Sequence, residues 1–182
     1  MEKLFEFIHA KLKVWIEQQK MFFVATAPSG SDCLVNCSPK GGESFRILNC
    51  NEVAYQDYMG SGIETIAHLR ENGRMVIMFC GFEGPPNIVR LFGQGSVITE
   101  EDSRYGELID HFPANEGTRA IIHVTVNRIL DSCRFSVPFY EYKGQRDVLD
   151  KWAANKGEEG LEEYRRTKNR ESIDGLPGLN ST

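Results

Sequence analysis

The feature that most constrains the fold is a short segment near the middle of the chain, Met75–Cys80, in which every residue is apolar. A strand with apolar side chains on both faces has no face for water, so it lies in the centre of a sheet or in a subunit interface. Gly84-Pro85-Pro86 predicts a turn after it, and residues 87–99 form a second strand pattern. This pattern contains Gly93 and Gly95, and glycine inside a strand commonly marks the bends that a closed or half-closed barrel requires.

Short β-rich segments separated by turn residues accompany this pair and predict an antiparallel meander rather than strand–helix–strand units. They are residues 21–27, 33–37, 44–48, 52–58 and 118–131. Helices are predicted at residues 2–19, 61–72 and 100–112 and around Trp152. The first helix would place Leu4, Ile8, Leu12, Trp15 and Ile16 on one stripe. The predicted fold class is therefore a β-barrel with flanking helices.

The chain has 182 residues, which suffices for one well-buried core and is short for two. We expect residues 1–143 to form the barrel domain with its N-terminal helix. Residues 144–182 would be a charged helical extension of the same unit. Because this extension has few apolar residues, we expect it to fold against a partner subunit or to fray.

Several classes of function lack their sequence signals. The net charge of −5 argues against nucleic-acid binding, and no apolar window reaches the length of a membrane span. Five cysteines without a C-x-x-C pair indicate reduced thiols, so we expect a cytoplasmic protein. The four histidines have no metal-ligand spacing, so no metal site is predicted. The nucleophile elbow, the Walker loop and the Rossmann turn are also missing from the sequence.

Gly60-Ser61-Gly62 lies between a predicted strand and a predicted helix, and two interpretations remain open. The free amides at the start of the helix favour binding of a phosphate group. Alternatively, Ser61 and Glu64 form a capping box, in which the two side chains satisfy the first amides of the helix. A capping Glu64 would compete with an anion for these amides.

Arg90 lies in a predicted strand, with Ile88 and Phe92 as its neighbours on the same face. A charge in such a position requires a partner, because an unpaired buried charge costs several kcal/mol. The partner is either an internal carboxylate, such as Asp57 or Glu83, or a phosphate or carbonyl group of a ligand.

Two further charged residues lie at predicted strand ends. Lys40 precedes Gly41 and Gly42, and it is either an exposed turn lysine or a ligand-binding cation. Asp57 comes just before the Gly-Ser-Gly turn. Its carboxylate could accept hydrogen bonds from a ribityl chain or from neighbouring backbone.

Four segments together resemble the pyridoxamine 5′-phosphate oxidase-related proteins. They are VNCSPKG (35–41), DYMGSGIETIAHL (57–69), ENGRMVIMF (71–79) and GPPNIVRLFG (84–93). The resemblance extends over roughly residues 21–137. It implies an antiparallel FMN-binding split β-barrel of Greek-key type, assembled as a homodimer with two flavins at the subunit interface.

The resemblance also implies a set of cofactor-binding residues. Lys40 matches a strand lysine of the family, Asp57 lies near the polar residue that closes the next strand, and Ser61 matches the serine of a Ser-Arg-Lys turn. Gly62 and Ile63 replace the two basic residues of that turn, so Arg90 would compensate for the lost positive charge. The residues expected to bind FMN are Ser38, Lys40, Asp57, Gly60, Ser61, Gly62, Thr65 and Arg90.

The function that follows is that of an FMN-binding oxidoreductase acting on a small molecule that the sequence does not identify. The Arg-x-His segment with which the oxidase holds its vitamin substrate is missing, so vitamin B6 oxidation is not expected. No side chain stands out as a general acid or base, and the catalytic residues stay unassigned. Two alternatives remain: a deazaflavin or haem bound in the same barrel, or a non-enzymatic flavin carrier or sensor.

Overall fold

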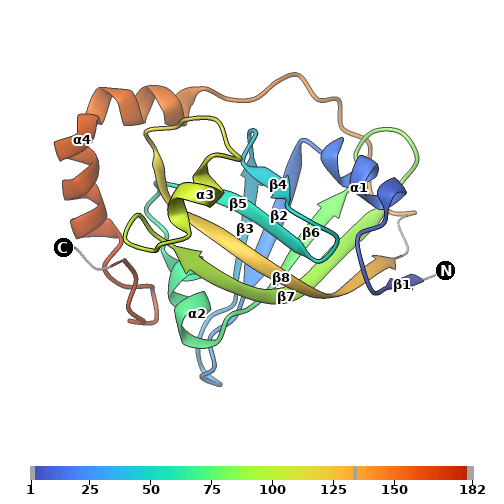
Figure 1. Cartoon of the computed structure of the whole chain (residues 1–182), viewed down its shortest axis with the longest axis horizontal. Coiled ribbons are helices and arrows are strands. Elements are labelled where there is room, and N and C mark those ends of the chain that lie inside the picture. Colours follow the sequence, from blue (N-terminus) through green and yellow to red (C-terminus); the bar gives the residue numbers. More distant parts are fainter. Residues whose placement is uncertain (1–2, 133–134, 180–182) are drawn as a thin grey trace.

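The computed structural model of the chain describes residues 3–132 and 135–179 (Figure 1). Its strands form one antiparallel sheet in the order β3-β2-β6-β7-β8-β5-β4, with β1 paired to β8. Their bounds are β1 Lys3–Phe5, β2 Met21–Thr26, β3 Asn36–Gly41, β4 Phe45–Ile47, β5 Glu52–Tyr58, β6 Arg74–Cys80, β7 Ile88–Ile98 and β8 Thr118–Ser132. The sheet curls into a half-barrel, and the predicted split barrel with flanking helices is confirmed.

The apolar segment that constrained the fold forms β6, which pairs with β2 on one side and β7 on the other. Ile77 and Phe79 of this strand are buried in the main core. The predicted bend in the next strand is also present, because the pairing of β7 with β8 shifts register at Gly93. A Cβ atom at Gly93 would lie 2.3 Å from the carbonyl oxygen of Thr125, so only glycine fits there.

β3 and β4 form the two ends of the sheet. The sheet curls until the C-terminal end of β3 faces that of β5, and we call the gap between these two strands the seam. In the described part of the chain, no backbone ladder joins β3 to β5, so the seam is closed by side chains. Four aromatic rings, those of Phe22, Phe45, Tyr55 and Phe79, pack together in the core beneath it.

The structure corrects the predicted position of β3, which covers Asn36–Gly41 rather than residues 33–37. The prediction ended the strand at Cys37 and took Pro39-Lys40-Gly41-Gly42 as turn residues. β3 is an edge strand, however, and proline is tolerated on an edge where its nitrogen faces away from the partner.

The first two predicted helices are shorter than expected. α1 spans Ala10–Glu17, because residues 3–5 pair with β8 as β1 and leave Leu4 largely exposed rather than on the buried stripe. The imidazole of His9 accepts a hydrogen bond from the amide of Leu12 and caps this helix. α2 spans Glu64–Asn72 and packs its apolar face into one end of the barrel.

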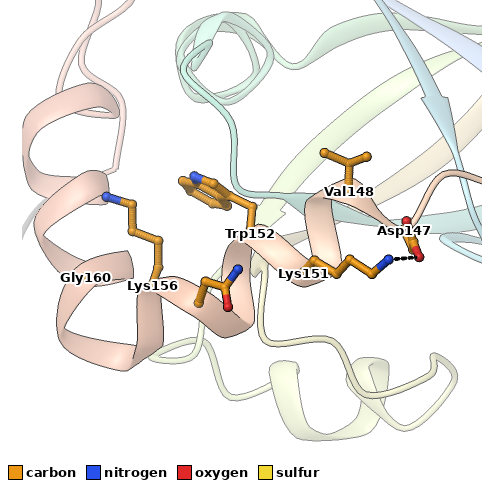
Figure 2. A pocket seen from close by; sticks show the side chains of 7 residues that line it. Asp147, Val148, Lys151, Trp152, Lys156 and Gly160 are labelled. Atoms are coloured by element: carbon orange, nitrogen blue, oxygen red, sulfur yellow. Dashed lines mark ion pairs between the residues drawn. The ribbon is translucent and has the colours of Figure 1, made fainter.

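α3 and α4 follow in the second half of the chain. α3 spans only Tyr105–Ile109 of the predicted 100–112, because Asp102 folds back onto the amide and side chain of Arg104 in a turn before it. α4 spans Val148–Lys168 and bends at Gly157, whose φ of 64° is not helical. Figure 2 shows the two arms of α4 with Trp152 before the bend and Gly160 beyond it.

The extension does not fray as one of the two expectations had it, because it packs against its own chain. α4 covers Met59 with Ala153 and Leu161. The segment 169–179, which we call the clasp, follows α4 and contains an isolated bridge between Glu171 and Pro177. Leu179 at the end of the clasp is buried in the main core.

None of the helices in the described residues is both long and apolar enough to cross a membrane. The four described cysteines are free thiols. The fifth, Cys133, lies outside the described residues.

Candidate functional site

Three charged side chains meet at the seam, and we call them the ion cluster. Asp57 of β5 is fully buried, and its two carboxylate oxygens accept hydrogen bonds from different cations. The Lys40 Nζ atom donates to one oxygen at 2.7 Å, and the Arg119 Nε atom donates to the other at 2.8 Å. The ion cluster thereby joins β3, β5 and β8 where the ladder is open.

A β-bulge places Arg119 in this cluster. The register of β5 on β8 shifts between Asp57 and Tyr58, so Ala120 and Thr118 have Cα partners on β5 and Arg119 has none. Simple alternation would place Arg119 on the face opposite Ala120. The bulge turns it toward Asp57 instead, as bulges commonly re-aim side chains.

The ion cluster keeps Asp57 ionised although it is buried. Burial alone would raise the pKa of the Asp57 carboxyl, but the charges and hydrogen bonds of Lys40 and Arg119 outweigh it and lower the pKa below its usual 3.8. Burial, together with the negative charge of Asp57, raises the pKa of the neighbouring Tyr55 hydroxyl, which therefore stays neutral. The cluster carries a net charge of about +1, from two cations and one carboxylate.

The Gly60-Ser61-Gly62 loop adjoins the ion cluster. The carbonyl oxygen of Gly60 accepts a hydrogen bond from Arg119 Nη1 at 3.1 Å and another from Asn169 Nδ2 of the clasp at 2.8 Å. Ser61 and Gly62 are exposed, and no described residue accepts a hydrogen bond from either amide. These two amides are available to an external acceptor.

The capping-box alternative is wrong, because α2 begins later than that pattern requires. Its N-cap residue is Ile63, which makes no side-chain capping bond. The Glu64 carboxylate nevertheless bends back toward the loop, since a Cβ atom at Gly62 would lie 2.7 Å from Glu64 Oε2. This negative charge opposes an anion at the loop amides.

Ser38 and Thr65, two more of the expected cofactor-binding residues, belong to a separate hydroxyl network. Asn36 connects them: its Nδ2 donates to Thr65 Oγ1 at 3.0 Å, and its Oδ1 accepts from Ser38 Oγ at 3.1 Å. The network continues to Thr26 and on to the ring of His68, which is fully buried on α2. It fastens β3 to α2 along the seam.

Arg90 does not lie with the other expected residues. Direct pairing places Arg90 opposite Met78, and Met78 opposite Phe23, on the face of the sheet that faces away from Lys40. Its Nη1 donates to Ser132 Oγ at 2.5 Å. Asp57, one of the two carboxylates considered as its internal partner, is bound by Lys40 and Arg119 instead.

A groove of about 1770 Å³ opens beside the seam, and Lys40 is among its lining residues. Its apolar floor includes Met21 and Phe23 of β2. Residues 138–147, which we call the strap, run across the top of the barrel from β8 to α4 and roof the groove (Figure 1). The strap is held by hydrogen bonds from the amides of Tyr140 and Tyr142 to Phe82 and Glu83.

A hollow on α4 is a poorer candidate for a site. The hollow in Figure 2 is lined only by residues of α4 and its N-cap, such as Lys151 and Trp152, so no second element encloses a ligand there. Among the described residues, no three histidine, cysteine, aspartate or glutamate side chains are grouped so that they could hold a metal ion.

Comparison with known proteins assigns the chain to a family. The family model described as pyridoxamine 5′-phosphate oxidase matches residues 8–133. The pyridoxamine 5′-phosphate oxidase family protein ustO of Aspergillus flavus is 40% identical over 196 residues, covering 97% of this chain and 78% of that protein. The chain belongs to the pyridoxamine 5′-phosphate oxidase family. The predicted family resemblance is thus confirmed.

Solved structures agree on the fold of this family member. HupZ from Group A Streptococcus aligns with a TM-score of 0.53 at 22% identity, covering 67% of this chain and 91% of HupZ. A protein from Lactobacillus delbrueckii, described as a candidate pyridoxamine 5′-phosphate oxidase, aligns with a TM-score of 0.52 at 11% identity. That alignment covers 69% of this chain and 94% of the other. At these identities the alignments show the shared split barrel and nothing further.

Sequence reasoning missed three residues of the site, namely Asn36, Arg119 and Asn169. Arg119 carried a usable signal, because it is a lone cation next to the apolar run that begins at Ala120, much as Arg90 is in its own strand. Asn169 carried no such signal. It lies in the charged tail, and only the bend of α4 brings it to Gly60.

Proposed function

We propose that this member of the family binds FMN at the seam and acts as an FMN-dependent oxidoreductase on a small organic molecule. The observation that carries the proposal is the pairing of a buried, net positive ion cluster with two exposed amides that donate to no described residue. Such amides at a helix start, with positive charge behind them, are suited to the phosphate of a nucleotide.

The charge balance supports a phosphate monoester. This group carries about −1.5 to −2 charges near pH 7. The resemblance implies that the two basic residues of the Ser-Arg-Lys turn lie nearest to this phosphate in the family. In this chain Gly62 and Ile63 stand in their place. Lys40 and Arg119 exceed the single charge of Asp57 and supply part of what is lost, and the loop amides add hydrogen bonds that need no side-chain charge.

Bound FMN would supply the redox chemistry, while the chain binds and orients it. The groove gives room for the rest of the cofactor and for a second molecule, because ligand pockets usually measure about 300–1,000 Å³ and this one measures about 1770 Å³.

Flavin binding by matched arginine variants tests the proposal. Arg119→Gln removes a cation of the ion cluster and one hydrogen bond to Gly60, so we expect the Kd for FMN to rise by about tenfold or more. Arg90→Gln removes an arginine that bonds to Ser132 and contacts neither the ion cluster nor the Gly60-Ser61-Gly62 loop, so the Kd should change by less than about twofold. Fluorescence titration of the apoprotein with FMN measures both. A larger loss with Arg90→Gln would place the phosphate near Arg90 and not at the Gly60-Ser61-Gly62 loop.

Identification of the native ligand separates FMN from the alternatives. Mass spectrometry of small molecules released from the purified protein should detect FMN, whereas a deazaflavin or haem would replace this proposal. Steady oxidation of a reduced nicotinamide with a defined acceptor would support an enzyme. Flavin binding without turnover for any donor would favour a carrier or sensor.

A further inference from the structure

The clasp reaches the Gly60-Ser61-Gly62 loop from the far end of the chain. Asn169 is fully buried, and its amide nitrogen donates to the Gly60 carbonyl oxygen at 2.8 Å. Its Oδ1 atom is buried and has no partner among the described residues. Burying an amide with half of its hydrogen-bonding capacity unused is costly, so the Asn169 position has a role beyond filling space.

The clasp is fixed in place by contacts that do not involve the loop. The Arg70 side chain donates to the carbonyl oxygen of Gly178, and Asp174 accepts from the amide of Leu34. Ser172 is buried, and its hydroxyl accepts from the amide of Leu176 within the clasp. Asn169 is therefore held on a rigid segment anchored to α2 and to the chain before β3.

Peptide geometry connects Asn169 to the anion site. The Gly60 carbonyl and the Ser61 amide belong to one planar trans peptide, so they point in opposite directions. Two donors, Arg119 and Asn169, hold the carbonyl on one side, and the Ser61 N–H is consequently held toward the other side. Donors on a carbonyl also polarise the peptide, which makes its N–H a stronger donor.

We propose that Asn169 is a positioning residue of the phosphate site, and that the clasp orients the Ser61 amide toward the anion by holding the Gly60 carbonyl. This inference rests on the proposed binding of FMN at the loop. It adds that phosphate recognition depends on a segment outside the part of the chain that the family model matches.

The test compares FMN with riboflavin, which lacks the phosphate. In Asn169→Ala we expect the Kd for FMN to rise by about tenfold, the effect of one lost buried hydrogen bond, with little change for riboflavin. Asn169→Asp keeps the size of the side chain, cannot donate to Gly60 when ionised and adds a negative charge, so its loss for FMN should be larger. Ser172→Ala is the matched control, because it removes one hydrogen bond of a buried clasp residue and leaves the bond from Asn169 to Gly60 in place.

The outcomes separate the two proposals. Equal weakening of FMN and riboflavin by Asn169→Ala, or the same loss of FMN selectivity in Ser172→Ala, would show a general structural role and overturn the inference while leaving FMN binding intact. If the native protein does not bind FMN, the proposed function fails. Titration of ¹⁵N-labelled protein with inorganic phosphate, followed at the Ser61 and Gly62 amides, then decides the inference. The inference is supported if phosphate changes the chemical shifts of these amides in the native protein but not in Asn169→Ala. It is overturned if phosphate changes them equally in both proteins, or does not change them in the native protein.

Discussion

Two sides of the barrel are held together in different ways. The wall formed by β6, β7 and β8 is joined by continuous backbone ladders and backed by buried apolar side chains such as Ile77 and Leu91. The seam between β3 and β5 is closed by the ion cluster, and the hydroxyl network fastens β3 to β2 and α2 beside it. The backbone groups of the wall strands are hydrogen-bonded to one another, whereas the amides of Ser61 and Gly62 have no partner in the part of the chain that the structure describes.

This difference separates stability from binding. The wall gains from burial of apolar area, which does not depend on pH or on ligands. The seam depends on charges and a few directional bonds, which respond to both. Mutations on the two sides should therefore differ in the size of their effect on stability, and also in whether that effect depends on pH or changes ligand binding.

The largest effect on stability is expected from the wall. Ile77 is fully buried, so Ile77→Ala should lower the free energy of unfolding by about 2–5 kcal/mol through lost burial and the cavity left behind. Urea unfolding measures this change. Ile173→Ala is the matched control, because that isoleucine is 73% exposed. A selective loss of FMN over riboflavin in Ile77→Ala would contradict the separation of the two sides.

A smaller effect with a different pH dependence is expected from the seam. Asp57→Asn leaves two cations without their carboxylate, but Lys40 is partly exposed to water and Arg119 keeps its bond to Gly60. The free energy of unfolding at pH 7 should therefore fall by about 1–3 kcal/mol. The folded pKa of Asp57 is lowered, so its contribution is complete well above pH 3.8 and is lost as the pH falls through the folded value.

Urea unfolding of both proteins between pH 7 and pH 3 measures this contribution. The native protein should lose more stability than Asp57→Asn over the acid end of this range. If the free energies of unfolding of the two proteins fell in parallel with pH, the folded pKa of Asp57 would not be lowered by the ion cluster.

The smallest effect is a gain in binding. Glu64→Gln removes the carboxylate next to the loop, so we expect the Kd for FMN to fall by about two- to fivefold, in line with a charge near a helix terminus. Glu107→Gln in α3 removes the same charge elsewhere and should leave the Kd unchanged. Isothermal titration calorimetry resolves the difference. Weaker binding in Glu64→Gln would show that the Glu64 side chain assists the ligand.

The wall was predictable from sequence, and the seam only in part. Apolar residues throughout Met75–Cys80 and the glycine at 93 determine a central strand and a bend, because both act locally. Lys40 and Asp57 were identified from the resemblance, but their ion pair crosses the open side of the sheet. Arg119 depends on a bulge, which shifts the alternation that sequence patterns rely on.

The clasp shows another limit of sequence patterns. Its residues Asn169 and Ser172 are polar but buried, and this burial comes from docking onto α2 and the loop rather than from a periodic pattern. Prediction from local pattern therefore assigned it to solvent or to a partner. Tertiary contacts determine where such a segment lies, and its sequence has no hydrophobic periodicity from which that position could be predicted.

Pro39 has a consequence for how molecules of this protein meet. Proline in an edge strand normally has its nitrogen on the side away from the ladder, so at Pro39 the free edge of the sheet is expected to lack a donor midway along a short strand. An incoming strand cannot form an unbroken ladder there, which protects the edge from templated aggregation in a crowded solution.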